Sequence, residues 1–319
     1  MPTTSVRATY RAALFRRLET ADSGQAELDQ IFGLLGQGRQ AAERAQLAEL
    51  ATQFEEGQAA LLVALRNTGH FFDWELEVMR VALAAGDVRA AYRYLGDHYK
   101  RLAEFERRLR ADLWLPAIVY AVVCIGVPVL AVFDGLMAPA IALALALLPL
   151  LMAAGLGWTA AISARRWQEG ELPHDWIDRC YRLPGLGRLL SLQQSLHYFS
   201  NLSLCTGGGL PLARSLQLSA AALPYSPRRA AFEKLRDDVA GGGRLSDALR
   251  QSGALEGVLM RGVRAEGEAG AALAQKVLTE STRQTVEEAM GRCARWLPQI
   301  LLLILPLVLL GNLLVMSYL

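Results

Sequence analysis

The chain has 319 residues, of which 53% are hydrophobic and 20% are charged, and its formal net charge is +2. Soluble globular proteins carry about 25% charged residues, so this composition predicts that part of the chain lies in lipid. The near-balance of acidic and basic residues argues against a surface for nucleic acid.

Three stretches of the chain are apolar enough to cross a bilayer as helices. They are residues 113–133, 136–164 and 296–319. A helix needs about 20 predominantly apolar residues to cross a hydrocarbon core of ~30 Å. The three stretches therefore predict transmembrane helices, the first two joined by a tight external turn at residues 134–135.

Basic residues flank these stretches on one side of the membrane only. Arginines lie before the first stretch, after the second and before the third, whereas the turn at 134–135 has none. The positive-inside rule then places the C-terminus in the periplasm and the charged segments in the cytoplasm. The predicted divisions are a first cytoplasmic helical domain at 1–112, a membrane pair at 113–164, a second cytoplasmic helical domain at 165–295 and a last membrane helix at 296–319.

The two charged segments repeat one another in sequence. Phe15 falls on Phe199 with an offset of 184 residues, and the tripeptide Trp-Leu-Pro begins a membrane stretch at 114–116 and again at 296–298. Ordered matches at a nearly constant offset indicate an internal duplication. The first copy is the more degenerate of the two.

The second copy reads as helices separated by glycine and proline. We predict helices at 191–205, after Pro211, from Ser226-Pro227 to the glycines at 241–243, at 245–251, at 255–265, and from about Ala271 into the third membrane stretch. Because no segment alternates convincingly with a period of two, the predicted fold is all-α. It is a multi-pass membrane protein with two homologous six-helix cytoplasmic bundles and three transmembrane helices.

Three motifs of the second copy follow in a fixed order: TGGGLPLARSL at 206–216, VAGGGRLSDAL at 239–249 and RAEGEAGAAL at 264–273. With the opening LPGLG at 183–187, the duplication and the order of domains and membrane spans, they resemble the F domain of type II secretion systems. The same domain forms the inner-membrane platform protein of type IV pili. The chain is identified as a short member of this family with a degenerate first repeat.

The resemblance implies an inner-membrane platform for assembly of a type IV pilus or a type II secretion pseudopilus. Such a platform couples a hexameric cytoplasmic ATPase to the insertion or removal of pilin subunits. The implied partners are that ATPase, pilins or pseudopilins, inner-membrane alignment proteins and a second copy of the chain in a dimer. The resemblance implies neither an enzyme nor a cofactor, and the sequence has no GxxxxGK[ST] phosphate loop.

Residues of the three motifs are candidates for interaction or structural roles. They are Gly207, Gly208, Gly209, Pro211, Gly241, Gly243, Glu266, Gly267, Glu268 and Gly270. The glycine runs stand where helices end and lack the lysine and hydroxyl of a nucleotide loop, which favours turns over phosphate sites. Glu266 and Glu268, with Asp87 at the matching place of the first copy, can either cap a helix or bind a cation or a partner.

Other polar residues allow further interpretations. Gln299 and Asn312 lie in the third membrane stretch, where amides can join helices of the same chain or of a neighbour. His174, Asp175, Asp178 and Cys180 follow the second stretch, but their spacing matches no standard zinc site, which favours a solvated linker. Two alternative functions remain: a membrane enzyme that uses this group, and a permease subunit of a transporter.

Overall fold

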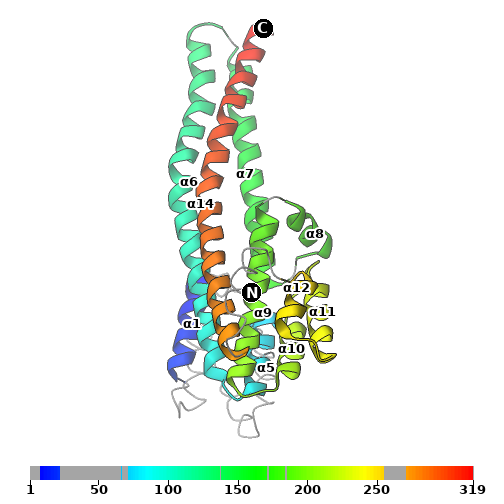
Figure 1. Ribbon diagram of the computed structural model, residues 1–319. Coiled ribbons are helices and arrows are strands. Elements are labelled where there is room, and N and C mark those ends of the chain that lie inside the picture. The colour runs from blue at the N-terminus through cyan, green and yellow to red at the C-terminus, as the bar shows by residue number, and fades with distance from the viewer. Residues whose placement is uncertain are drawn as a thin grey trace. The chain divides into compact units, whose positions relative to one another are not determined.

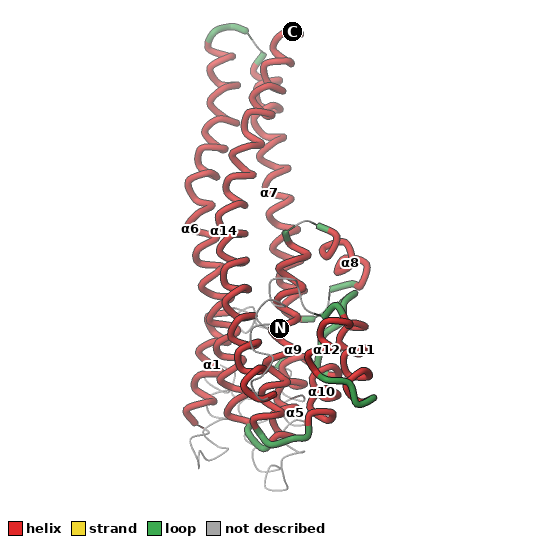
Figure 2. The backbone as a smooth tube through the Cα atoms, viewed as in Figure 1, coloured by secondary structure: helices red, strands yellow, loops and turns green. Residues whose placement is uncertain are grey.

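The computed structural model describes residues 8–21, 66, 71–136, 138–170, 172–183, 185–254 and 271–318. These residues form ten α-helices and no strand (Figure 1). Figure 2 shows the same helices, with the described loops and turns in green. The predicted all-helical class is therefore confirmed for the described part of the chain. The count of six helices per repeat stays a prediction, because residues 22–65 and 255–270 lie outside that part.

The chain folds as two compact units. The first contains Met1–Ala103 and Glu169–Glu288, and the second contains Glu104–Gln168 and Ala289–Leu319. The first unit thus combines most of both predicted cytoplasmic segments, and the second contains the predicted membrane stretches. That residues 1–112 and 165–295 form two separate bundles stays a prediction.

The described helices of the first repeat are α1 (Ala8–Ala21), α5 (Asp73–Ala85) and the beginning of α6 (Val88–Phe133). At the start of α5, the Glu75 side chain accepts a hydrogen bond of 2.7 Å from the Phe72 backbone N–H. At its end, Gly86 adopts a left-handed φ of 76° and its N–H returns to the Leu83 carbonyl at 3.0 Å. Glycine adopts this conformation without the strain that a Cβ would add. The local sequence therefore sets both ends of α5.

The second repeat begins with α8 (His174–Arg182) and α9 (Leu186–Gly207). It continues with α10 (Leu212–Ala221), α11 (Arg229–Ala240), α12 (Leu245–Ser252) and the beginning of α14 (Ala271–Tyr318). Helices α9 to α12 and α14 overlap the predicted ones, with two corrections: α9 begins at Leu186, before the predicted residue 191, and the start of α11 is later than predicted. Ser226, the predicted start of this helix, lies in a turn before it, where its hydroxyl accepts a hydrogen bond of 3.2 Å from the Arg228 N–H. The helix itself begins at Arg229.

The duplication is visible in the residues that α1 and α9 bury. Four positions of α1, spaced three or four residues apart, are at most 2% exposed, and the positions 184 residues later in α9 are equally buried. The pairs are Ala8 and Leu192, Arg11 and Ser195, Phe15 and Phe199, and Leu18 and Leu202. Since this spacing places residues on one face of a helix, the two helices bury the same face in both repeats.

Two helices of the structure are long and apolar enough to cross a membrane. They are α6, whose apolar part reaches Phe133, and α7 (Pro139–Glu169). Only 11% of the most apolar stretch of α7 is buried, and Leu151 is 68% exposed. The core helix of a soluble protein would bury such residues. The exposure therefore favours a lipid environment.

A tight turn joins these two helices. Gly135 has a φ of 70°, and the Leu136 N–H donates to the Ala131 carbonyl at 2.9 Å. Next to the turn, Ala131 of α6 packs on Ala142 of α7. Small side chains at such a contact let two membrane helices approach closely. The turn lies at the predicted position, between the first and second predicted spans.

The third predicted membrane stretch is the last part of α14, which continues without interruption from Ala271 to Tyr318. Pro298 and Pro306 lie inside the helix. Most side chains beyond Trp296 lie outside the described residues, so that this stretch crosses a membrane stays a prediction. In both repeats a helix of the first unit continues directly into an apolar stretch. This helix is α6 in the first repeat and α14 in the second.

Candidate functional site

The glycine run between α9 and α10 lies against the end of α5. A Cβ added at Gly208 would lie 2.2 Å from the carbonyl oxygen of Ala85 and 2.7 Å from its Cβ. A glycine is needed at position 209 for a different reason, because its φ of 81° lies in the left-handed region that other residues rarely adopt. No atom lies within 4 Å of a Cβ placed at Gly207. The predicted turn is therefore also a point of close backbone contact between the two repeats.

Apolar side chains of both repeats pack together beside this contact. Val81 of α5 is fully buried. It packs against Cys205 of α9, Leu218 of α10 and Ala222 directly after α10. Leu204, also from α9, packs against the core of the first repeat. The first unit therefore has an apolar core that residues of both repeats share.

Two histidines lie in an aromatic cluster at the same interface. The rings of His98 and His197 approach Trp74 edge-on, with centroids at 5.3 and 5.7 Å. His197 Nδ1 and the Tyr94 hydroxyl share a hydrogen bond of 2.9 Å. Burial lowers the pKa of His98 to about 3 and that of His197 to about 4. Both imidazoles are therefore neutral at physiological pH.

A cleft of about 330 Å³ opens between the repeats. Its lining residues are Asp87, Ala90, Tyr94, Ser200, Ser203, Leu204, Gly207 and Thr279. The fold thus brings together two candidates, Asp87 and Gly207. The Asp87 carboxylate accepts a hydrogen bond of 3.0 Å from the Ala90 N–H, which is the geometry of a cap at the start of α6. A role of Asp87 in cation or partner binding stays a prediction.

The second glycine run contacts its own helix. The backbone N–H of Gly241 donates to Asp237 O at 2.9 Å and that of Gly243 donates to Asp238 O at 3.0 Å. Gly242, between them, has a φ of 89°. Because these N–H groups point back at helix carbonyls, they do not form a cradle for a phosphate. Pro211 stands directly before α10 and accepts the Ser215 N–H at 2.9 Å.

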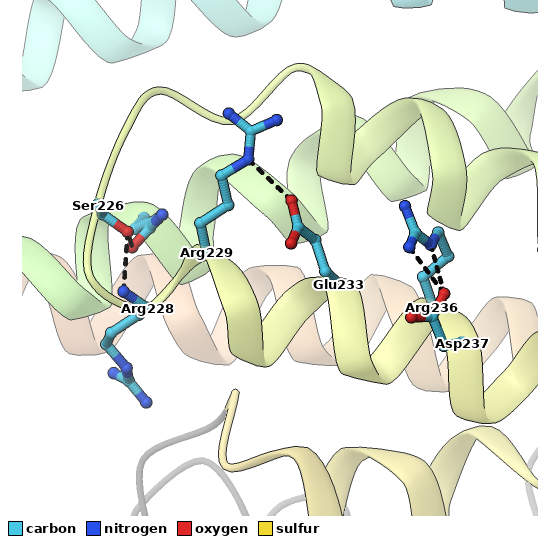
Figure 3. Close-up of polar contacts among 7 residues, drawn as sticks. Ser226, Arg228, Arg229, Glu233, Arg236 and Asp237 are labelled. Atoms are coloured by element: carbon cyan, nitrogen blue, oxygen red, sulfur yellow. Dashed lines mark hydrogen bonds and ion pairs between the residues drawn. The ribbon is translucent and has the colours of Figure 1, made fainter.

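Figure 3 shows the polar contacts of α11. Arg229 pairs with Glu233 at 3.1 Å, and Arg236 pairs with the adjacent Asp237. These side chains are between about a third and two thirds exposed, and such pairs contribute about 0–1 kcal/mol each. The charges of α11 therefore form a solvated face rather than a reaction centre.

The remaining predicted residues divide into three groups. Glu266, Gly267, Glu268 and Gly270 lie outside the described residues, as does the side chain of Asn312. Gln299 is described and exposed on α14. The segment from His174 to Cys180 was interpreted as a solvated linker. Most of it is exposed, but it is a packed helix rather than a linker: it forms α8, in which Ile177 is buried and the Tyr181 hydroxyl is bonded to Gln194.

The described residues contain no group of three or more His, Cys, Asp or Glu side chains that could hold a metal ion. This statement covers the His174–Cys180 segment, whose residues are described, but not Glu266 and Glu268.

A buried ion pair in the first repeat is absent from our sequence predictions. Arg11 Nη1 of α1 donates to both carboxylate oxygens of Glu75 at 2.6 Å, and the Tyr99 hydroxyl donates to Glu75 Oε1 at 2.5 Å. The guanidinium of Arg11 also lies 3.7 Å from the Phe72 ring centre. Burial raises the pKa of Glu75, whereas the charge of Arg11 opposes that rise. The position of Arg11 on the apolar face of α1 was the available signal.

Residues 198–318 match the family described as type II secretion system (T2SS), protein F. The matched stretch begins inside α9 and ends with α14, so it includes the contact of Gly208 and the third predicted membrane stretch. The expected resemblance is thereby confirmed over these residues. The first repeat, α8 and α7 lie outside the match. No curated protein matches the chain.

Proposed function

We propose that this chain is an inner-membrane platform protein for assembly of a type IV pilus or a type II secretion pseudopilus. The match of residues 198–318 to the secretion protein F family carries this proposal. The exposed apolar surfaces of α6 and α7 support it, because they suit helices that contact lipid or other membrane proteins. The first unit and the N-terminus lie in the cytoplasm and the C-terminus lies in the periplasm.

The proposed platform transmits work that another protein performs. A hexameric cytoplasmic ATPase acts on the first unit, and the chain passes this motion to pilin or pseudopilin subunits in the membrane. Helices α6 and α14 suit this role, because each runs without interruption from the first unit into the second. Inner-membrane alignment proteins and a second copy of the chain complete the assembly.

Deletion of the gene, with complementation, tests the function directly. We expect loss of surface filaments or of secreted substrate, with pilin precursors still made and inserted. Unchanged filaments and secretion in the deletion strain would contradict the proposal.

Site-specific photocrosslinking tests the partners. A photoreactive side chain at Leu148 of α7, which is 64% exposed, is expected to crosslink to a pilin. The same group at Ala142, which is 6% exposed on the same helix, is the matched control and should not. Crosslinks from Leu148 only to lipid would remove the proposed pilin contact along α7.

A further inference from the structure

Helix α8 has two chemically different faces. Ile177 on its inner face is 7% exposed, and the Tyr181 hydroxyl one turn later donates to Gln194 Oε1 of α9 at 3.2 Å. Gln194 Oε1 also accepts a hydrogen bond of 2.5 Å from the Ser226 hydroxyl. These contacts hold α8 against the second repeat in one orientation.

The opposite face of α8 leaves large apolar side chains in the open. Trp176 is 50% exposed and Leu183, directly after the helix, is 54% exposed. The guanidinium of Arg179 lies 6.0 Å from the Trp176 ring centre. Since residues spaced three and seven apart share a helix face, Trp176, Arg179 and Leu183 form one outward stripe, which we call the α8 stripe.

The charges around the stripe favour an anionic surface. Arg179 lies within the stripe and the exposed Arg182 lies beside it. Of the two carboxylates in α8, Asp175 lies at the margin near Arg182, and Asp178 lies on the inner side, where its Oδ1 is buried. A tryptophan with neighbouring arginines is the combination that settles at the boundary between lipid headgroups and acyl chains.

The chain limits how far α8 can lie from the end of α7. Helix α7 ends at Glu169 and α8 begins at His174. Five residue steps of extended chain reach at most about 18 Å. Two further large apolar side chains beside α8 are exposed: Leu186 at the start of α9 is 38% exposed, and Tyr225, packed on His174, is 41% exposed.

We propose that α8 is an interfacial helix that binds the cytoplasmic surface of the bilayer. Trp176 and Leu183 enter the headgroup–acyl boundary, and Arg179 and Arg182 bind anionic lipid headgroups. The outward tryptophan and leucine then lie in the environment that they prefer, and the second repeat is held at a set height against the membrane. The proposal needs α7 to cross the membrane but does not need the platform function.

The test places a spin label on the stripe of the full-length chain. Leu183→Cys is made in a background in which Cys124, Cys180, Cys205 and Cys293 are replaced, and the labelled chain is put into nanodiscs of phosphatidylethanolamine and phosphatidylglycerol. Arg250→Cys on α12, which is exposed, is the control position. Collisions of the label with oxygen report lipid, and collisions with a nickel chelate report water. We expect severalfold fewer nickel collisions at position 183 than at 250, with more oxygen collisions.

Charge reversal then tests the headgroup contact. Arg179→Glu combined with Arg182→Glu should return the label at 183 toward the nickel accessibility of the control position. Arg214→Glu combined with Arg244→Glu reverses two exposed arginines elsewhere in the second repeat and should leave the label unchanged. Nanodiscs of phosphatidylcholine alone should weaken the protection in the unreversed chain.

Two results would overturn the proposal. A label at 183 that is as open to the nickel chelate as the label at 250 shows a solvated helix. A label that is shielded from both reagents shows that another protein covers the stripe. If the labelled variants do not fold, hydrogen exchange of residues 174–183 in the unmodified chain decides: faster exchange without phosphatidylglycerol supports the proposal, and equal exchange contradicts it.

Discussion

The two repeats bury the same helix face but fill it with different chemistry. Phe15 of α1 and Phe199 of α9 occupy equivalent buried positions. One turn earlier, the first repeat has Arg11 and the second has Ser195. The Ser195 hydroxyl donates to the Ser191 carbonyl at 3.0 Å, within its own helix, and has a longer contact of 3.4 Å with the Ala254 carbonyl. Arg11 instead needs the carboxylate of Glu75, 64 residues away.

This difference shows how a duplicated helical fold tolerates divergence. A short hydroxyl side chain can satisfy its hydrogen bonding on a carbonyl of its own helix, so Ser195 does not require a charged partner elsewhere in the repeat. A buried arginine must be matched by a carboxylate at a fixed place, since an unpaired charge in the interior is costly. The first repeat, though degenerate in sequence, is therefore constrained by one long-range polar network.

Replacing Arg11 of the first repeat with serine, the residue that the second repeat has there, should have the largest effect on stability. Arg11→Ser leaves Glu75 buried without its cation, and removal of one partner of a buried pair costs about 3–5 kcal/mol. The measurement is the free energy of unfolding of the full chain in detergent, by urea and circular dichroism. The combined change Arg11→Met, Glu75→Leu and Tyr99→Phe removes the whole network and should recover most of the loss. A loss below about 1 kcal/mol for Arg11→Ser would show that the network does not hold the first repeat together.

Separating the repeats at the contact of Gly208 with Ala85 should have the next largest effect on stability. Gly208→Ala places a methyl group against the Ala85 carbonyl oxygen, and overpacking of this kind costs about 1–3 kcal/mol. Gly207→Ala is the matched control, because no atom lies within 4 Å of its added Cβ. We expect a lower thermal midpoint and weaker hydrogen-exchange protection of α5 for the first variant only. Equal behaviour of the two variants would mean that α5 and α9 separate freely.

Lowering the pH should weaken the interface through His197. Its folded-state pKa of about 4 lies below the unfolded value of 6.5, so the unfolded chain takes up the proton first. Stability is therefore full above pH 6.5 and falls as the pH drops toward 4. One imidazole contributes at most about 1.4 kcal/mol per pH unit in this window.

The variant His197→Asn should reduce this pH dependence, measured as the difference in unfolding free energy between pH 7.5 and pH 5.5. Tyr94→Phe is the control, because it removes the hydrogen bond to Nδ1 but keeps the imidazole. If both variants keep the same dependence on pH as the unmodified chain, His197 is not the group that responds.

Removing an exposed ion pair of the first repeat should have the smallest effect. Arg93 Nε lies 2.7 Å from Glu19 Oε1, and the arginine is 63% exposed. Glu19→Gln should cost no more than about 1 kcal/mol, and high salt should reduce that cost further. Unfolding of the two chains at low and high salt measures this. A cost as large as that of Arg11→Ser would contradict the distinction between buried and exposed pairs.

Much of the fold was predictable because its signals are local. Glycine runs, prolines and helix periodicity predicted α9 to α12 within a few residues, and the apolar lengths predicted α6 and α7 as membrane helices. The candidate site was less predictable. The glycine run at 207–209 was predicted as a turn, but its contact with Ala85 depends on how α5 and α9 pack. Helix α8 was missed because its fixing contacts come from Gln194 of the next helix.

The sequence by itself determined the helical class, the apolar stretches of α6 and α7, the duplication and the likeness to a secretion protein F domain. Each of these depends on composition, spacing or motif order along the chain, and such features follow from residues that are near one another in the sequence. Only the tertiary structure decided that both repeats share one unit, that Arg11 pairs with Glu75, and that Tyr94 and His197 meet across 103 residues of chain. Those contacts follow from packing of distant helices, and no local pattern specifies which faces meet.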